Sequence, residues 1–198
     1  MERYEVLVVG AGPCGIAVGA AARKAGVSCV LFDKGCITNS IVDYPYYMTF
    51  FSTAVMLEVG GIPFTIPESK PTRREALTYY RRVVEHFEVD VHQYEEVVDI
   101  QGTEGDFTVT TRFRDGSTRT YGADALVIAT GGFAHPNFLN VPGEDLEAVL
   151  PEQVGAHIQL RALIPESRAG SARCRAVSDM MRLIRDTLPH LQDPGEEP

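Results

Sequence analysis

Residues 4–16 read YEVLVVGAGPCGI, in which a short apolar segment leads directly into three glycines, Gly10, Gly12 and Gly15. The apolar run predicts a buried strand, and the residues after it predict a helix. In such a unit the first glycine permits the tight turn, the second lets the backbone approach a phosphate, and the third lets the helix pack closely on the strand. Pro13 suits the first helical turn, where a missing N–H costs little. The segment is therefore predicted to fold as a Rossmann-like β–loop–α unit.

An acidic residue follows at the distance that this motif requires. After a predicted helix at residues 16–25, Gly26 stops the helix and a second apolar strand, VSCVLFD, ends at Asp33. A carboxylate about 20 residues beyond the glycines is placed to accept a hydrogen bond from a ribose hydroxyl. The helix N-terminus favours a negative pyrophosphate. Together these elements predict a bound adenine dinucleotide; the alternative is a glycine-rich turn that serves packing only.

The bulk composition excludes several classes of partner. With 44% hydrophobic residues, the 198-residue chain can bury a sizeable core. A formal net charge of −9 argues against nucleic acid and against an anionic membrane surface. No apolar run is long enough to span a bilayer, and the first residues enter a core strand without a basic leader region. We therefore expect a cytoplasmic protein that contacts neither nucleic acid nor membrane.

The four cysteines form no CxxC pair and no metal-ligand spacing, so no metal site is predicted. Cys29 alternates within a predicted strand and is interpreted as a small buried hydrophobic residue, whereas Cys36 and Cys174 give no specific signal. Cys14 lies inside the glycine loop at a helix N-terminus, a position that lowers a thiol pKa. Two interpretations of Cys14 stay open: a small residue that fits a tight loop, or a redox-active catalytic thiol.

The middle of the chain predicts an irregular segment followed by a long helix. Residues 35–71 have little periodicity and are rich in aromatic residues, Pro and Thr, which suits either a cover over a flat ring system or a satellite core. Thr72 is a good N-cap, and Glu75 completes a capping box. A returning strand at residues 89–92 then gives the strand–helix–strand–helix–strand order of a parallel sheet.

The next segment predicts a meander. Residues 95–121 alternate with a period of two and predict three short strands, with turns at residues 102–106 and 115–116. A separate apolar strand at residues 125–129 leads into Thr130 and two glycines. The predicted fold class is therefore α/β: a Rossmann-like doubly wound parallel sheet with an inserted three-stranded β-meander. Such a meander is typical of FAD enzymes, whereas simple NAD dehydrogenases usually lack it.

Several motifs resemble those of one group of flavoproteins. VVGAGPCG and DALVIATGG resemble the FAD domain of the two-dinucleotide-binding flavoproteins, which include thioredoxin reductase-like and glutathione reductase-like enzymes. The middle segment is more specific, because NSI, MTFFST, LEVGGIPF and KPTRREALTYYRRV occur in the order seen in the YpdA-type bacillithiol disulfide reductases. The resemblance covers residues 3–146.

The resemblance implies non-covalently bound FAD, NADPH as electron donor and a small-molecule disulfide as substrate. The pyrophosphate would lie along Gly10, Gly12, Pro13, Cys14 and Gly15. The adenosine ribose would be held by Asp33, with Lys34 beside it. The ribityl chain and the isoalloxazine ring would be approached by Asn39, Ser40, Met48 and Thr49. The adenine would meet Val97, and the dinucleotide would be closed over by Ala129, Thr130 and Gly131. Because the family has no CxxC pair beside the flavin, the thiol candidate is Cys14.

The resemblance ends at residue 146 and divides the chain into two predicted parts. Residues 1–146 form the FAD-binding domain, and residues 147–198 form a divergent C-terminal segment with an amphipathic helix at residues 174–188 and a disordered end. No second strand–GxGxxG–helix unit occurs there, so no NADPH-binding domain is recognised, although the family would require one. The segment is interpreted either as a shifted reading of a longer gene or as a replacement that covers the sheet edge.

The favoured function is that of an FAD-dependent oxidoreductase of the pyridine nucleotide-disulfide reductase type, related to NADPH-dependent bacillithiol disulfide reduction and present in truncated form. One alternative is a non-catalytic FAD- or nucleotide-binding module that needs a partner chain. A second alternative is a single-domain NAD-dependent dehydrogenase, with which Asp33 is compatible. The sequence leaves the oligomeric state open, a homo-oligomer included.

Overall fold

The computed structural model describes residues 1–103, 105–132 and 161–163. Its helices are α1 (Pro13–Ala25), α2 (Asn39–Val42) and α3 (Arg73–Phe87), with a 3₁₀ turn η1 (Val55–Leu57) between α2 and α3. Its strands are β1 (Glu2–Val9), β2 (Cys29–Asp33), β3 (Asp90–Gln93), β4 (Glu95–Thr103), β5 (Asp106–Phe113), β6 (Thr118–Ile128) and β7 (Arg161–Leu163). The predicted helix at residues 174–188 lies outside the described residues.

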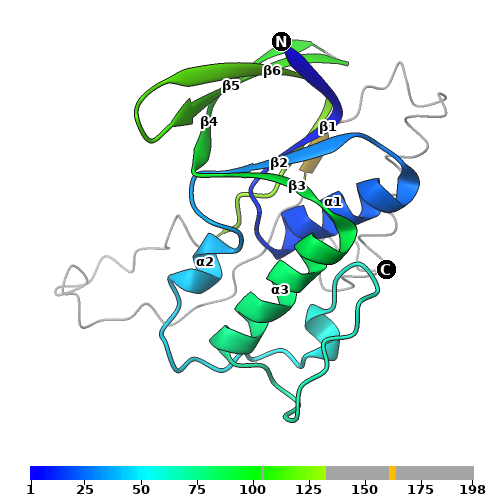
Figure 1. Cartoon of the computed structure of the whole chain (residues 1–198), viewed down its shortest axis with the longest axis vertical. Coiled ribbons are helices and arrows are strands. Elements are labelled where there is room, and N and C mark those ends of the chain that lie inside the picture. The colour runs from blue at the N-terminus through cyan, green and yellow to red at the C-terminus, as the bar shows by residue number, and fades with distance from the viewer. Residues whose placement is uncertain (104, 133–160, 164–198) are drawn as a thin grey trace, which may run out of the picture.

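All described strands join one sheet (Figure 1). Its order is β3-β2-β1-β6-β5-β4, and β7 pairs with the end of β6. The strands β3, β2, β1 and β6 are parallel and follow the strand order of a Rossmann sheet. The strands β4, β5 and β6 form an antiparallel meander. The predicted α/β class, with a parallel sheet and an inserted three-stranded meander, is confirmed.

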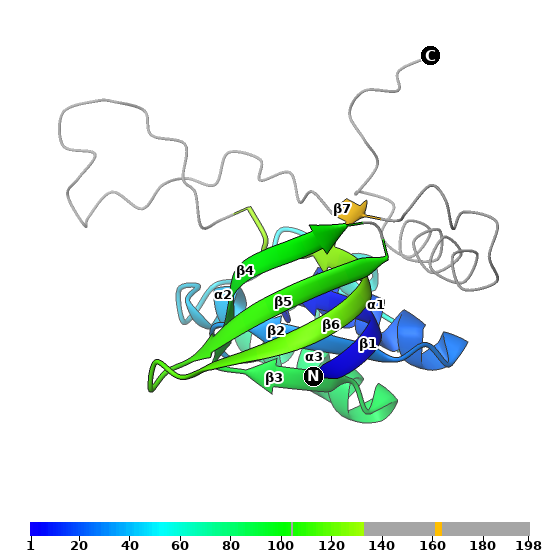
Figure 2. The same ribbon diagram turned by 90° about the horizontal axis from the view of Figure 1, so that it is seen from above.

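The two faces of the parallel sheet are covered by different elements (Figures 1 and 2). Val6, Val8 and Leu31 belong to the core cluster that includes the buried residues of α1 and α3. The alternate residues Leu7 and Phe32 point to the opposite face, where they join a second cluster with residues of the meander. Because both faces are buried there, the second half of β1 (Val6–Val9) and the first four residues of β2 (Cys29–Phe32) are apolar at every position.

Segment 35–71 packs in part against α3. The hydroxyl of Tyr79 on α3 accepts a hydrogen bond from the Val59 N–H at 2.7 Å and donates to the Ile62 carbonyl at 2.7 Å. The Tyr79 ring also stacks on Phe64, with ring centroids 4.1 Å apart. One buried tyrosine therefore ties a stretch without long regular elements to the helix layer.

The meander and the last parallel strand are one continuous strand, which corrects the prediction of two separate strands. Residues 118–123 pair with β5 and residues 121–128 pair with β1, so both ladders are present at residues 121–123. Their overlap keeps the chain extended at Tyr121-Gly122-Ala123, where the sequence pattern indicated a break. The meander therefore grows directly out of the parallel sheet.

A buried polar cluster joins the meander to the parallel sheet. Glu95 is 2% exposed, and one of its carboxylate oxygens accepts hydrogen bonds from the Thr111 hydroxyl at 2.6 Å and the Tyr121 hydroxyl at 3.0 Å. Its other oxygen lies 2.8 Å from Nδ1 of His92 on β3. Because a buried carboxylate is costly unless it is hydrogen-bonded, this set of partners stabilises the start of β4 at this place.

The predicted capping box of α3 is confirmed. The Thr72 hydroxyl accepts a hydrogen bond from the Glu75 N–H, and the Glu75 carboxylate accepts one from the Thr72 N–H at 2.8 Å. Hydrogen bonds from the Thr72 backbone, and then from its side chain, hold the pKa of Glu75 below its usual value.

In the described residues, no helix combines the length and apolarity needed to cross a membrane.

We expect Thr72→Ala to lower the free energy of unfolding by about 1 kcal/mol, because it removes the N-cap acceptor. Chemical denaturation followed by circular dichroism measures this change. Thr78→Ala on the same helix is the matched control, and its effect should stay within about 0.5 kcal/mol because Thr78 is exposed and caps nothing. Equal effects of the two substitutions would contradict the role given to the capping box.

Candidate functional site

The glycine loop lies where the carboxyl ends of the parallel strands β1, β2 and β6 meet. Gly10 has a φ of +110°, and a Cβ at this position would collide with the carbonyl oxygen of Ala129 at the end of β6. A Cβ at Gly15 would collide with the carbonyl oxygen of Gly10. Both clashes are with backbone atoms, which cannot rotate away. The protein's own packing therefore requires glycine at these two positions.

Gly12 has no such internal explanation. Its backbone is extended, with φ −77° and ψ −178°, and apart from its two chain neighbours no described residue has an atom within 4 Å of a Cβ built there. Gly12 is also the N-cap of α1, and no side-chain hydrogen bond from the described residues caps the helix. A bare helix N-terminus beside open space fits a phosphate group that approaches the backbone. The geometry therefore supports the predicted pyrophosphate position.

Asp33 lies beside this loop at the end of β2. One carboxylate oxygen accepts a hydrogen bond from the Ala11 N–H at 2.8 Å, and the other accepts one from the Gly35 N–H at 2.8 Å. A carboxylate offers about four acceptor positions. Two of them therefore stay available for ribose hydroxyls, while the backbone bonds hold the side chain in place.

The end of β6 forms the other side of the loop. The Ala129 N–H donates to the Val9 carbonyl at 2.8 Å, which keeps β6 parallel to β1 up to the glycines. Thr130 and Gly131 follow as exposed residues, and Gly131 has a φ of +79°. The structure thus brings Gly10–Gly15, Asp33 and Ala129–Gly131 together, as the sequence predicted.

The helix α2 is tied to the same loop. The N–H of Thr38, at its N-terminus, donates to the Ala11 carbonyl at 2.9 Å. The amide nitrogen of Asn39 donates to Asp43 at 3.0 Å, and its amide oxygen accepts a bond from the Cys36 N–H at 3.4 Å. Ser40 is exposed. Asn39, the first α2 residue predicted to lie near the flavin, therefore directly follows Thr38, whose backbone is hydrogen-bonded to the glycine loop.

The other predicted contacts lie further along the molecule. The Met48 carbonyl accepts a hydrogen bond from the Arg73 N–H at 2.9 Å, and Thr49 forms a bridge with Thr72, so both residues lie against the start of α3. Arg73 also donates to the Ile41 carbonyl of α2. Val97 lies in β4 and packs against the cluster beneath the meander. Their proposed contacts to a ligand stay predictions.

Cys14 is 7% exposed, and burial raises the pKa of its thiol to about 11. The expectation that the helix N-terminus lowers this pKa is therefore wrong, because desolvation of the thiolate dominates. At neutral pH the thiol holds its proton. Cys29 is confirmed as a buried hydrophobic residue, and burial raises its pKa to about 12.

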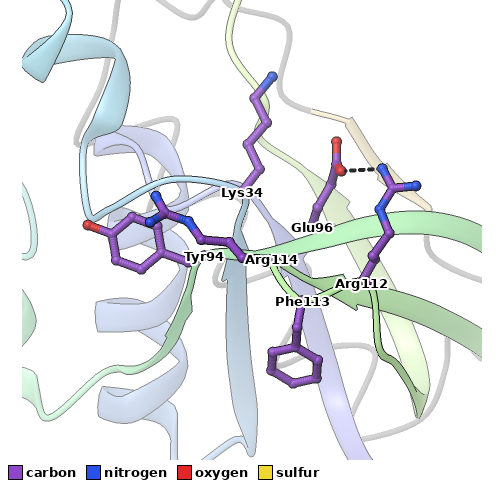
Figure 3. Close-up of a pocket in the computed structure, with 7 residues that line it drawn as sticks. Lys34, Tyr94, Glu96, Arg112, Phe113 and Arg114 are labelled. Atoms are coloured by element: carbon purple, nitrogen blue, oxygen red, sulfur yellow. Dashed lines mark hydrogen bonds and ion pairs between the residues drawn. The ribbon is translucent and has the colours of Figure 1, made fainter.

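A hollow of about 370 Å³ opens at Lys34, the residue that follows Asp33 in the sequence (Figure 3). It is lined by Lys34, Tyr94, Glu96, Arg112, Phe113, Arg114 and Gly116. Of these residues the sequence predicted only Lys34 as part of the site. The others come from the β3–β4 connection (Tyr94), from β4 (Glu96) and from the β5–β6 hairpin, which are distant in sequence from the glycine loop. Within the sequence, the cluster Arg112-Phe113-Arg114 was the signal that could have been noted.

Comparison with known proteins assigns the chain to a family. Residues 7–161 match the model of the pyridine nucleotide-disulphide oxidoreductases. Because this match covers most of the chain, the chain belongs to that family. The match extends beyond residue 146 and ends at Arg161, the first residue of β7. The predicted domain boundary at residue 146 stays a prediction.

Named relatives make the likeness more specific. Over 150 residues the chain is 37% identical to "Bacilliredoxin reductase Bdr" of Bacillus subtilis (strain 168). The aligned residues cover 75% of this chain and 45% of that protein. The solved structure of bacillithiol disulfide reductase Bdr (YpdA) from Bacillus cereus matches 74% of this chain and 45% of its own length, at 41% identity and a TM-score of 0.69. The corresponding Staphylococcus aureus structure matches 74% of this chain and 44% of its own length, at 37% identity and a TM-score of 0.66.

These matches confirm the resemblance to the YpdA-type reductases that the motifs indicated. They also show that the chain spans less than half the length of the relatives that it matches.

We expect Gly15→Ala to destabilise the fold by about 1–3 kcal/mol, because its Cβ would overpack against the Gly10 carbonyl. Gly12→Ser is the matched control. It should leave the free energy of unfolding unchanged or raise it by a few tenths of a kcal/mol, because serine is a good N-cap. Urea denaturation of both variants measures the difference. A stable Gly15→Ala variant would contradict the close contact between α1 and β1.

We expect alkylation of Cys14 by iodoacetamide to become about tenfold faster per pH unit between pH 7 and 10, because the reactive thiolate forms only near its raised pKa. Mass spectrometry of a Cys36→Ser/Cys174→Ser variant isolates the reaction from the other two cysteines, and peptide mapping separates Cys14 from Cys29. A rate that levels off near neutral pH would show an activated thiol instead.

Proposed function

We propose that the chain binds FAD at the glycine loop and forms the FAD-binding part of an NADPH-dependent reductase of small-molecule disulfides. The observation that carries the proposal is Gly12, which neither backbone strain nor packing requires to be glycine. Gly12 is also the N-cap of α1, and no side-chain hydrogen bond from the described residues caps the helix there. The family match and the names of the relatives support the disulfide-reductase class.

In this proposal the backbone N–H groups at the start of α1 bind the pyrophosphate, and Pro13 supplies a preset helical turn without a competing donor. The Asp33 carboxylate accepts from the adenosine ribose with its remaining acceptor positions. Bound FAD would supply two-electron transfer. The residues of α2, with Met48 and Thr49, are proposed to lie toward its flavin end, and Val97 toward its adenine.

Cys14 is the proposed thiol for exchange with a disulfide substrate: its thiolate would attack one sulfur of the substrate, form a mixed disulfide and release the other sulfur as a thiolate. Its position within the loop places it along the proposed pyrophosphate. The thiolate is the nucleophile in thiol–disulfide exchange, so this role requires the loss of the proton that burial retains. As the free chain stands, the Cys14 thiol is held in its unreactive form at neutral pH.

The second candidate is a nucleotide-binding module that works with a partner chain. This candidate is favoured because the chain spans less than half the length of the relatives that it matches. Mixing the purified chain with NADPH separates the two candidates. Oxidation of NADPH coupled to loss of the disulfide would exclude the module, whereas bound FAD that only a chemical reductant can reduce would favour it.

We expect the purified chain to take up FAD in a one-to-one complex, and we expect Gly12→Ser to weaken this binding about tenfold or more, because the serine side chain occupies the space that the pyrophosphate needs. Flavin absorption after gel filtration and fluorescence titration measure both results. Gly26→Ala, at the other end of α1, should cost stability because Gly26 has a φ of +68°, yet it should leave FAD affinity unchanged. A wild-type chain that takes up no FAD would overturn the proposal.

A further inference from the structure

Two residues that line the hollow are sequence neighbours of Asp33 and Val97, the residues proposed to hold the adenosine half of the ligand. Lys34 directly follows Asp33, and Glu96 directly precedes Val97; both line the hollow. The Tyr94 N–H donates to the Gly35 carbonyl at 2.9 Å, and the Gly35 N–H in turn donates to Asp33. The hollow is therefore held by backbone hydrogen bonds next to the proposed ribose position.

Tyr94 has a conformation that packing does not explain. It is the single residue between β3 and β4, and its φ of +59° is unusual for an aromatic residue. Glycine or asparagine would adopt this turn more easily. The ring is 41% exposed and belongs to neither core cluster of the described residues. Strained residues that persist without a packing role cluster at ligand sites.

A guanidinium group lies on this ring. Cζ of Arg114 is 4.0 Å from the centroid of the Tyr94 ring, so two flat groups lie one over the other in the hollow (Figure 3). Arg114 itself is exposed. Aromatic rings and guanidinium planes are the surfaces on which nucleobases stack. The pair therefore presents a flat, preassembled surface beside the proposed ribose position.

The polar groups around this surface can pair with the edge of a base. Lys34 offers a donor, and Glu96 offers acceptor oxygens while Arg112 holds its carboxylate at 2.7 Å. Adenine presents ring-nitrogen acceptors and an exocyclic amine donor. Glu96 is the carboxylate in the lining of the hollow, and its charge opposes a phosphate placed beside it.

We propose that Tyr94 and Arg114 form a stacking platform for the adenine ring of the bound dinucleotide, with Lys34 and Glu96 at the edge of the base. The inference rests on the proposed function, since it concerns the adenosine end of the same ligand. It makes Tyr94 and Arg114 determinants of base preference, while the glycine loop and Asp33 bind the parts that all nucleoside diphosphates share.

Titration calorimetry with ADP and UDP tests this proposal, because the two ligands share the pyrophosphate and ribose and differ only in the base. We expect the wild type to prefer ADP by about tenfold, since the larger purine stacks better. We expect Arg114→Lys and Tyr94→Asn to reduce this preference to about parity. Arg114→Lys keeps the positive charge but removes the planar guanidinium group. Tyr94→Asn removes the aromatic ring, and asparagine tolerates the positive φ at this position.

Lys24→Leu is the matched control, because it removes a cation from a ring, Phe87, at the far end of α1. It should leave the ratio of ADP to UDP affinity unchanged. Damage to the fold weakens both ligands together and does not move this ratio. An unchanged ratio in both platform variants would overturn the platform. Tighter binding of 2′-phospho-ADP than of ADP would also overturn it, in favour of a phosphate site, and a wild type that binds neither ADP nor FAD would overturn the proposed function as well.

Discussion

The fold and its proposed site both depend on the contact of three backbone segments at the glycine loop. Gly10 lies against the Ala129 carbonyl of β6, and Gly15 lies against the Gly10 carbonyl, so β1, β6 and α1 meet with no side chains between them. This close approach brings the bare N-terminus of α1 to the carboxyl ends of the strands. Ligands of open α/β sheets bind at that edge. The same contact therefore determines the packing of the first helix and the position of the proposed pyrophosphate.

Much of this arrangement could be predicted from local sequence patterns. The strand–glycine–helix order and the acid at residue 33 predicted the loop, because each of these signals reflects backbone geometry within about 30 residues. The capping box at Thr72 was predictable for the same reason. The family resemblance added the YpdA-type reductases as relatives, and the comparisons confirm that likeness. The roles of individual cofactor-binding residues stay predictions.

The parts that could not be predicted depend on contacts between distant segments. Tyr94 and Arg114 meet because a one-residue turn after β3 and the β5–β6 hairpin converge beside β2, and no local pattern encodes that meeting. The raised pKa of Cys14 has a similar origin: the loop position suggested activation, but the surrounding core desolvates the thiol. The continuity of β6 was missed because two overlapping ladders, rather than residue type, keep it extended.

The central claim is that the start of α1 binds a pyrophosphate directly through its backbone. Two-dimensional ¹H–¹⁵N NMR of the chain during titration with ADP tests it at the atoms concerned. The account predicts that the amide signals of Ala11, Gly12, Cys14 and Gly15 shift first and most, and that they reach saturation with a single dissociation constant. Saturating shifts confined to other segments, with these amides unmoved, would contradict it.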